Sequence, residues 1–502
     1  MSTEHRPLKS YVIVGGGTAG WISAAVLSHT LQNTGVSITL VESPDIPTVG
    51  VGEATIPSFV DLLSFLNISK QDFITKTNAT FKLAIKFVDW HQQGQDYWHP
   101  FGKIGSKIDG KEFYQHWLKS NIHGGKFALT DFSPAIAMAK ENRFFIPDPK
   151  NPNNLSSSAY ALHFDAGLAA KFLAEYAQAK GVKLIKAHVH DVEQHEDGRI
   201  KSLNLNNVQQ ITSDFFIDCS GQRSLLMQKT LRVGFDDWQH YLPVNSAAVM
   251  QTEKMSILAP YTESTAHENG WRWRIPLQNR TGNGFVFSQD FCSDQQAIDL
   301  LTSTVTEKPI NDPKIMRFTT GKSKRFWYKN CLSVGLSSGF LEPLESTGIH
   351  LIMKGILNFV QMLPDHNLAD VTQNEYNRLM DAEYDSIRDF IVLHYCVSKR
   401  NDSAFWKMWQ HTAIPDSLQN KLALFKSQGR LMRNDLDLFA SDSWYAVLEG
   451  MGVTPNSYDP TVDASNFKLI QKILTESETA LRNNVQQLMT HDEYITRLLT
   501  ST

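Results

Sequence analysis

The first apolar run of the chain is short and ends at a group of glycines. In "YVIVGGGTAGWISAAVL", four residues from Tyr11 to Val14 precede the glycines, and a longer apolar segment follows them. A short apolar run that ends at glycines is typical of a buried strand, and the longer segment predicts a helix. "VSITLVES" (36–43) predicts a second strand. This order of strand, helix and strand predicts an α/β fold.

Later segments continue this pattern. "SDFFIDCSGQRSLL" (213–226) and "KNCLSVGLSSGFLEPLESTGI" (329–349) each predict a buried strand that ends in a polar, glycine-containing turn. Apolar residues recur at helical spacing from Ile349 onward, so we expect a helix to begin at Ser346 or Thr347. The C-terminal third is predicted to be helical and is rich in aromatic residues, and "PDPKNPNNLSSS" (147–158) predicts a long surface loop.

The segment "TFKLAIKFVDW" (80–90) alternates between apolar and polar positions. Its apolar residues share one face of the predicted strand, so Lys82 and Lys86 project together from the other face. On this pattern alone, both lysines are expected to point into solvent.

Two indoles occur close together in "NGWRWRIPLQ" (269–278). Side chains alternate along a strand, so Trp271 and Trp273 lie on the same face, and Pro276 is expected to end the strand. Taken alone, this motif predicts an aromatic core.

Composition narrows the class of protein. The chain has 502 residues, of which 42% are hydrophobic and 20% charged, which is typical of a globular protein with more than one core. A net charge of −4 argues against an electrostatic binder of nucleic acid. The four cysteines are widely spaced without a CxxC pair, so we expect a reduced cytoplasmic protein with no cysteine-built metal site. The polar N-terminus predicts no signal peptide, and no apolar run is long enough to span a membrane.

The glycines of the first turn carry the clearest chemical signal. Gly15, Gly17 and Gly20 have GxGxxG spacing between a predicted strand and a predicted helix, and Glu42 follows where a ribose-binding acid belongs. This combination predicts a dinucleotide site with the phosphates at the helix N-terminus. "VGVGEATIPS" (49–58) favours FAD over NAD, because its glycines let the backbone lie against a flat ligand. The chain has no second GxGxxG for NAD(P)H, so another protein must reduce the flavin.

These motifs together resemble the flavin-dependent halogenases of the tryptophan-halogenase family. The resemblance covers nearly the whole chain and rests on "GGGTAGW", "GVGEATIPS", "FKLAIKF", "YALHFDAGLAAKFL", "WRWRIP", "FLEPLESTGI" and "DSWYAVLEGMG". WxWxIP is its most specific signature. The resemblance implies a Rossmann-like FAD module of the flavin monooxygenase type, with a substrate module and a helical C-terminal cap. We expect the FAD module at 8–355, substrate segments inserted at about 80–150 and 240–320, and the cap at 356–502.

The resemblance also implies a reaction. Reduced FAD and O2 oxidise a halide, chloride or bromide, to hypohalous acid, which passes through the protein to an aromatic substrate. A separate, diffusible flavin reductase supplies FADH2. We expect no metal, and the oligomeric state, a homodimer included, stays open.

Family positions then assign roles to individual residues. The residue matching Lys82 would donate to hypohalous acid or be halogenated by it, with Lys86 as its structural control. Glu345 matches a glutamate proposed to orient the halogenating species or to take the ring proton. Thr347 and Gly348 match the halide site. The motif residues Trp271, Trp273, Ile275 and Pro276 would line the channel and keep the substrate away from the flavin. The residues expected to contact the flavin are Gly15, Gly17, Thr18, Ala19, Gly20, Glu42, Gly50, Glu53, Ala54, Gly335, Gly348 and Ile349.

The substrate site is indicated by fewer residues. In "DYWHPFG" (96–102), His99 and Phe101 match a pair that brackets an indole, and the alternative for this segment is a polar surface loop with one anchored phenylalanine. The tyrosine-rich lid of the tryptophan-specific enzymes has no residue-by-residue match, so indole or a larger indole- or phenol-bearing molecule is favoured over free tryptophan. Two other functions are left open: an FAD-dependent aromatic hydroxylase and a flavin-binding protein without catalytic activity.

Overall fold

The computed structural model describes residues 7–45, 52–206, 209–432 and 436–500. Its contacts divide the chain into two compact units, and each unit is assembled from three separate segments. Unit 1 comprises Met1–Asn78, Phe164–Gln239 and Phe318–Asp385, and unit 2 comprises Ala79–His163, His240–Arg317 and Ser386–Thr502.

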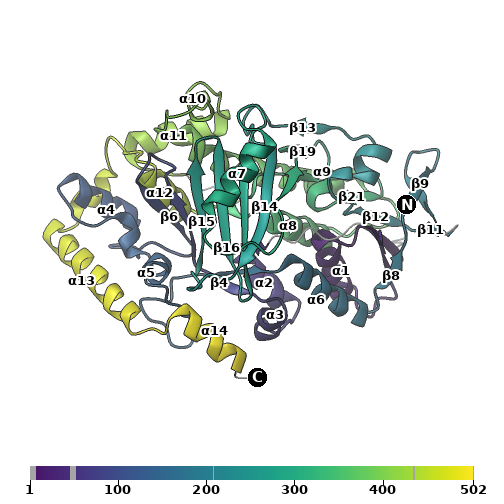
Figure 1. Ribbon diagram of the computed structural model, residues 1–502, viewed down its shortest axis with the longest axis horizontal. Coiled ribbons are helices and arrows are strands. Elements are labelled where there is room, and N and C mark those ends of the chain that lie inside the picture. The colour runs from purple at the N-terminus through teal and green to yellow at the C-terminus, as the bar shows by residue number, and fades with distance from the viewer. Residues whose placement is uncertain (1–6, 46–51, 207–208, 433–435, 501–502) are drawn as a thin grey trace. The chain divides into compact units, whose positions relative to one another are not determined.

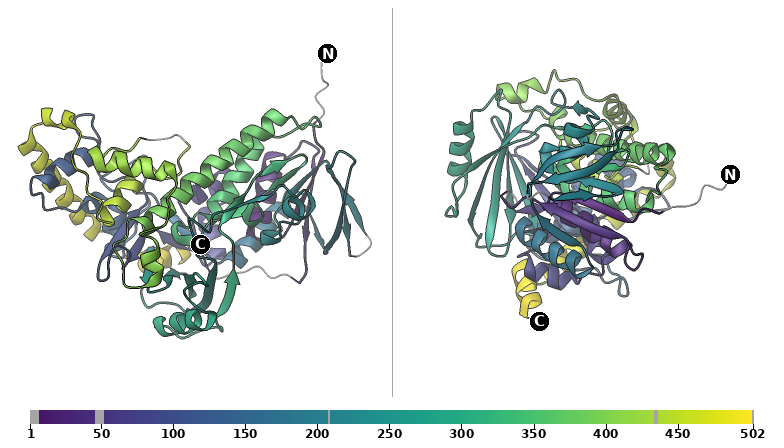
Figure 2. Two further views of the ribbon diagram at one scale, coloured as in Figure 1. Left: turned by 90° about the horizontal axis from the view of Figure 1, so that it is seen from above. Right: turned by 90° about the vertical axis from the view of Figure 1, so that its right-hand side faces the viewer.

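This division differs from the expected domains in two respects. The first inserted segment extends to His163 instead of about residue 150. Residues 356–385, which we expected in the C-terminal cap, belong to unit 1, while the residues from Ser386 onward join the inserted segments in unit 2. The long helix α9 (Asp370–Cys396), drawn in green in Figure 2, contains the boundary between the two units, which falls after Asp385.

Unit 1 is built on a six-stranded sheet with the order β20-β21-β12-β1-β2-β8. All neighbouring strands run parallel except β20, which is antiparallel to β21. The predicted strands correspond to β1, β2, β12 and β21, which confirms the α/β class. The strands are β1 (Ser10–Val14), β2 (Ser37–Glu42), β8 (Lys183–Lys186), β12 (Phe215–Asp218), β20 (Trp327–Tyr328) and β21 (Cys331–Ser333).

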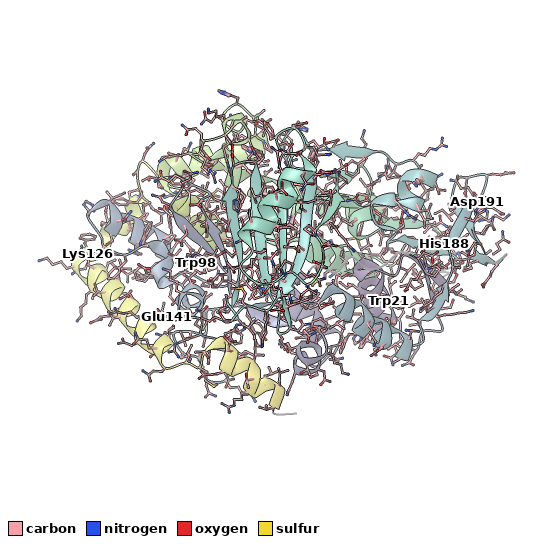
Figure 3. The ribbon with its side chains drawn as sticks, in the orientation of Figure 1. Trp21, Trp98, Lys126, Glu141, His188 and Asp191 are labelled. Atoms are coloured by element: carbon pink, nitrogen blue, oxygen red, sulfur yellow. The ribbon has the colours of Figure 1, made fainter. Side chains whose placement is uncertain are left out.

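Alternation along β1 produces two layers on this sheet. Val12 and Val14 pack into a core with a smaller antiparallel sheet of β9 (Val189–Gln194), β10 (Ile200–Leu205) and β11 (Gln210–Thr212). Tyr11 points the other way and contacts Phe359 of α8 with a ring-centroid distance of 6.3 Å. Trp21 of α1 is buried, whereas His188, just before β9, and Asp191 on β9 lie at the exposed edge (Figure 3).

The other elements of unit 1 are short apart from three helices. The helix α1 packs against both α6 and α8. The helices are α1 (Thr18–Thr30), α2 (Ser58–Phe65), α3 (Lys70–Lys76), α6 (Ala166–Ala179) and α8 (Gly348–Gln361), and the remaining strands are β3 (Glu53–Ala54), β13 (Phe235–Asp237), β19 (Gly321–Ser323) and β22 (Gly339–Phe340).

Unit 2 contains a seven-stranded sheet with the order β18-β14-β17-β16-β15-β5-β6. All pairs are antiparallel except β15 with β5. The helix α7 (Asp294–Thr304) covers one face through an apolar core that includes Phe285 and Leu301 (Figure 1). The strands are β5 (Ala84–Val88), β6 (Asp96–Pro100), β14 (Ser246–Glu253), β15 (Tyr261–His267), β16 (Gly270–Pro276), β17 (Arg280–Phe287) and β18 (Lys314–Arg317).

The short strand β4 (Thr80–Lys82) lies directly before β5 in the chain and pairs antiparallel with β7 (Ala161–Phe164), which follows much later. The predicted loop at 147–158 contains no helix or strand. Among the described residues we find no helix with the length and apolar character of a membrane span. The other helices of unit 2 are α4 (Phe113–Ile122), α5 (Pro134–Lys140), α10 (Ala404–Met408), α11 (Asp416–Gln428), α12 (Ser441–Gly450), α13 (Phe467–Gln486) and α14 (His491–Thr500).

Candidate functional site

The glycine-rich turn of unit 1 joins β1 to α1, as the sequence predicts. Gly15 has a φ of +119°, and a Cβ atom at this position would lie 2.1 Å from the carbonyl oxygen of Cys219. A Cβ atom at Gly20 would lie 1.9 Å from the carbonyl oxygen of Gly15. Gly17, directly before the helix, has open space around its ideal Cβ position. Two glycines therefore permit close backbone packing, while the third leaves room beside the helix N-terminus.

The residues around this turn fit an FAD molecule. The carboxylate of Glu42, at the end of β2, lies beside Gly16, where it can reach a ribose bound over the turn. Burial, and secondarily the charge of Asp165, raise the pKa of the Glu53 carboxyl to about 7. Gly335 has a φ of +78°, and its ideal Cβ position is 2.7 Å from Cβ of Ala19, so its turn lies against the start of α1. Gly50 lies outside the described residues.

The helix α8 begins at Gly348, and Thr347, one of the two residues expected at its start, directly precedes it. Thr347 is its N-cap residue and makes no side-chain capping hydrogen bond, and Ser346 before it adopts a left-handed conformation with φ of +60°. Among the described residues, no atom outside the adjacent residues and the helix's own backbone lies within 4 Å of the ideal Cβ position of Gly348. Gly348 itself is exposed. The first backbone amides of α8 therefore have no side-chain cap and have open space beside them, which suits an anion. The Glu345 side chain just before this turn is buried.

The structure corrects the interpretation of residues 80–90 as one strand. The chain leaves the β4–β7 pair after Lys82 and enters the seven-stranded sheet at Ala84. Lys82 is 0% exposed, and its Nζ lies 5.1 Å from the ring centroid of Phe101. Lys86 is partly exposed and forms an ion pair with Asp96, with 3.0 Å between Nζ and Oδ2. The two lysines thus have different environments, and Lys82 is the buried one, beside the ring of Phe101.

Aromatic side chains gather near Phe101 within unit 2. His99 lies on β6, so this segment is a buried strand and not a surface loop. The His99 ring is 6.2 Å from that of Phe101, 5.3 Å from that of Phe390 and 5.8 Å from that of Phe439, between centroids. Trp444 of α12 contacts Phe390 edge-on at 4.9 Å. Lys82, His99 and Phe101 are therefore brought together beside a cluster of packed aromatic rings.

The two indoles of WxWxIP lie on one face of β16, with 6.0 Å between their ring centroids. Trp271 is 1% exposed and contacts the ring of Trp90. The Trp273 ring covers Gly284 on β17, where a Cβ atom would lie 2.0 Å from the indole. These contacts show that both indoles are packed in unit 2. The channel role of Trp271, Trp273, Ile275 and Pro276 stays a prediction.

Sequence reasoning missed the polar residues beside Lys82. Thr80 Oγ1 donates to the carbonyl oxygen of Pro276 at 2.6 Å and also contacts Nδ1 of His163 at 3.0 Å. His163 Nε2 in turn lies 2.9 Å from Oγ1 of Thr262. Burial, followed by the charge of Lys82, lowers the pKa of His163 well below its usual value, so this ring is neutral. His163 belongs to the "YALHFD" motif, but its position in that motif did not indicate its partners.

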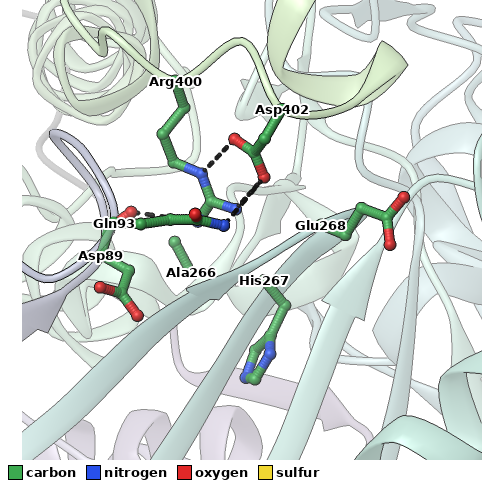
Figure 4. Close-up of a pocket in the computed structure, with 7 residues that line it drawn as sticks. All are labelled: Asp89, Gln93, Ala266, His267, Glu268, Arg400 and Asp402. Carbon is green, nitrogen blue, oxygen red and sulfur yellow. Dashed lines mark hydrogen bonds and ion pairs between the residues drawn. The ribbon is translucent and has the colours of Figure 1, made fainter.

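A polar pocket of about 390 Å³ in unit 2 is lined by none of the predicted site residues. Figure 4 shows Arg400 between Asp402 and the loop that carries Asp89. Glu268 adds a third carboxylate to its lining. Three carboxylates against one arginine make this pocket unsuitable for a halide. The described residues contain no cluster of three or more histidine, cysteine or acidic side chains able to hold a metal.

Comparisons with known proteins agree with the geometry. The family described as "Tryptophan halogenase" matches residues 10–466. The chain is 33% identical to tryptophan 6-halogenase SttH from Streptomyces toxytricini, over 96% of this chain and 97% of the relative. Two solved structures, BrvH from Brevundimonas sp. BAL3 and Xcc4156 from Xanthomonas campestris, both flavin-dependent halogenases, each superpose with a TM-score of 0.94. Each is 38% identical, covering 98% of this chain and 99% of the other.

These matches extend over the sequence and over the fold. Flavin-dependent halogenases use FADH2, O2 and a halide, receive the reduced flavin from a separate flavin reductase, and act on an aromatic substrate. The FAD-compatible turn and the open N-terminus of α8 are present in this chain. It therefore belongs to the tryptophan-halogenase family and is a flavin-dependent halogenase.

Proposed function

We propose that this halogenase acts on an electron-rich aromatic molecule, indole or a larger compound that bears an indole or phenol, with Lys82 as the residue that receives the hypohalous acid. The observation that carries the proposal is the fully buried Lys82 ammonium group over the ring of Phe101. A lysine is rarely buried without a specific role, because removing its charge from water is costly.

The flavin and the halide would be held by unit 1. Gly15, Gly17 and Gly20 shape the phosphate turn, Glu42 would bind the ribose, and the amides of Thr347 and Gly348 would bind the halide. Reduced FAD supplies two electrons and the halide two more, so that O2 and a proton end as one molecule of water and one of hypohalous acid.

Lys82 would then direct the halogen to the substrate. Its ammonium group can donate a hydrogen bond to the oxygen of hypohalous acid, so that the ring carbon takes the halogen and water leaves. Alternatively, its neutral amine exchanges one hydrogen for the halogen, releases water and passes the halogen on. In either case, one aromatic hydrogen is replaced by the halogen. We propose Glu345 as the carboxylate that takes the ring proton, on the basis of the family position and its burial.

The large side chains of the WxWxIP motif would limit the reaction to halogenation. Trp271 and Trp273 are buried neighbours whose rings are held by Trp90 and by the β17 backbone at Gly284. Rigid indoles would keep the aromatic substrate away from the flavin while hypohalous acid passes, which would suppress direct hydroxylation.

An indole-like ring suits the aromatic cluster of His99, Phe101, Phe390, Phe439 and Trp444, because aromatic rings pair favourably edge-on or offset. SttH is a tryptophan 6-halogenase, so free tryptophan is the natural comparison substrate. We also propose a cytoplasmic location, because all four cysteines are free thiols.

The test is a reaction with FAD, NADH, an unrelated flavin reductase, O2 and either indole or tryptophan, run in parallel with chloride and with bromide. Mass spectrometry should show a halogen isotope pattern, with more product from indole than from tryptophan. A product that gains only one oxygen atom and needs no halide would instead identify a hydroxylase.

Substitution of the two lysines tests the residue assignment. Lys82→Met should reduce halogenated product by about 100-fold or more while FAD affinity and O2 consumption persist. Lys86→Met is the matched control and should retain most of the activity, because Lys86 pairs with Asp96 at the sheet surface. Halogenation that survives Lys82→Met would contradict the assignment. Glu345→Gln should lower kcat without changing FAD affinity.

A further inference from the structure

The strand that carries Lys82 is only three residues long, so its own sheet pairing gives it little rigidity. Its residues Thr80, Phe81 and Lys82 pair with His163, Leu162 and Ala161, respectively, of β7. Thr80 is fixed at one side through the carbonyl oxygen of Pro276 and the ring of His163.

Phe81, the residue next to Lys82, is held by a histidine 410 residues further along the chain. The backbone N–H of Phe81 donates to Nε2 of His491 at 3.2 Å. The opposite ring nitrogen, Nδ1, lies 2.8 Å from the carbonyl oxygen of Leu258. A carbonyl oxygen only accepts, so Nδ1 carries the proton and Nε2 is the acceptor of a neutral ring. Burial lowers the pKa of His491 to about 4, which keeps the ring neutral at ordinary pH.

His491 is itself fixed by the segment that surrounds it. Its backbone N–H donates to the carbonyl oxygen of Asn142 at 2.8 Å, and the side chain of Asp492 accepts from the N–H of Leu258 at 3.2 Å. The first residues of α14 therefore bind both backbone groups of Leu258. His491 is 0% exposed, so water cannot replace it as the acceptor for Phe81.

Aromatic packing reinforces the same point of the strand. The Phe81 ring stacks on Phe144 with 4.0 Å between centroids, and Tyr494, one turn after His491 on α14, contacts Phe81 edge-on at 5.6 Å. Phe81 is thus fixed by its backbone and by its side chain, and Lys82 leaves the same strand directly after it.

We propose that His491 is a positioning residue for Lys82: by accepting the Phe81 N–H, it fixes the backbone from which the Lys82 side chain extends over Phe101. This inference rests on the proposed role of Lys82. The C-terminal helix α14 is, on this basis, part of the support of the active site. A misplaced lysine would bind hypohalous acid less well and let more of it escape.

Three variants test the proposal. His491→Phe keeps a ring of similar size but removes the acceptor, and His491→Gln restores an acceptor oxygen near the position of Nε2. Tyr494→Phe is the matched control on the same helix, because it keeps the ring against Phe81 and loses only the hydroxyl. The assays measure kcat, KM for indole, FAD affinity, melting temperature, and the fraction of hypohalous acid captured by an added thioether.

We expect His491→Phe to lower kcat about tenfold or more, with KM and FAD affinity within about twofold and a larger fraction of halogen lost to the thioether. His491→Gln should recover kcat to within about threefold of the unchanged protein. The control Tyr494→Phe should have the kcat of the unchanged protein. A folded His491→Phe protein with normal kcat and no greater loss of halogen overturns the proposal. It is also overturned if His491→Gln is as defective as His491→Phe, or if neither variant folds cooperatively, since the role would then be structural.

The parallel Lys82→Met measurement separates this proposal from the proposed function. If halogenation survives Lys82→Met, the lysine assignment fails and the positioning role falls with it. If Lys82→Met is inactive while His491→Phe is fully active, only the positioning role is wrong.

Discussion

Lys82 and Lys86 show how much a single residue depends on contacts outside its own segment. They lie four positions apart and alternate identically with apolar neighbours, yet Lys82 is buried and Lys86 is partly exposed. The difference begins at Leu83, whose N–H donates to the carbonyl oxygen of Pro260 at 2.7 Å, while its own carbonyl oxygen accepts from Phe101. These contacts transfer the chain between two sheets, so local alternation could not separate the lysines.

Glu449 on α12 gives a residue-scale prediction about pH. It accepts the hydroxyl of Tyr114, and burial raises the pKa of its carboxyl from 4.5 to about 7. A raised pKa means that the folded state binds this proton more tightly than the unfolded state, so stability falls as the pH rises from 4.5 to about 7. Glu449→Gln should therefore raise the free energy of unfolding by about 3 kcal/mol at pH 8 and have little effect near pH 4.5.

The measurement is urea-induced unfolding of both proteins at the two pH values. If the two proteins differ in free energy of unfolding by the same amount at both pH values, the Glu449 carboxyl does not titrate in this range in the folded protein. A stabilising effect confined to low pH would reverse the expected sign and contradict the burial argument.

At the scale of elements, two glycines in the turn between β1 and α1 are expected to have different roles, one in FAD binding and one in backbone packing. Gly17→Ala places a methyl group in open space, so the apo-protein should keep its free energy of unfolding within about 0.5 kcal/mol. The same methyl group would occupy the room for the FAD phosphates, and FAD affinity should fall about tenfold or more. Gly20→Ala should instead destabilise the apo-protein by about 3 kcal/mol, because its Cβ would meet the Gly15 carbonyl oxygen.

Fluorescence titration with FAD and thermal unfolding of the apo-protein measure the two effects separately. If Gly17→Ala binds FAD normally, the phosphates do not lie beside this glycine. If Gly20→Ala is as stable as the unchanged protein, then the helix can shift away from the turn.

The strand pair β16–β17 carries a second prediction at this scale. Gly284→Ala would push a Cβ atom into the indole of Trp273, so it should destabilise the protein by about 2 kcal/mol and alter tryptophan fluorescence. Trp273→Phe in the same protein should recover part of this loss, because the smaller ring leaves room for the methyl group. Unfolding of the two single variants and the double variant measures the coupling, and strictly additive losses would show that the two side chains do not interact.

Sequence patterns predicted local turns and the ends of helices and strands, but they did not predict which distant residues contact them. The GxGxxG turn, the position of Thr347 at the start of α8 and the end of β16 at Pro276 depend on local geometry, so short motifs were enough. The support of Lys82 depends on His163 and on His491, which lies 410 residues from Phe81. A local pattern of apolar and polar residues cannot predict a contact between residues that are so far apart in the sequence. The family resemblance assigned a role to Lys82 but did not indicate which residues fix its position.

At the scale of the whole molecule, segments of the two units alternate along the sequence, and each unit is built from three of them. The sequence indicated two insertions in the flavin module, but it did not show that the C-terminal helices share a unit with them. Residues 386–502 bring α12 and α14 to β6 and β4, respectively, so unit 2 is complete only when the last segment is in place. We therefore expect the segments of unit 2 to fold together and not as an independent cap.

The last prediction concerns the supply of reduced flavin to the whole protein. The chain has one GxGxxG motif and a net charge of −4, which indicates neither an NAD(P)H site nor a strongly charged docking face. FADH2 should thus reach the protein by diffusion, and two unrelated flavin reductases adjusted to equal FADH2 output should give halogenation rates equal within about twofold. Added sodium sulfate should leave this ratio unchanged, because screening weakens only charge-driven docking. A several-fold advantage for one reductase at equal FADH2 output, lost on adding the salt, would instead reveal a direct and specific complex.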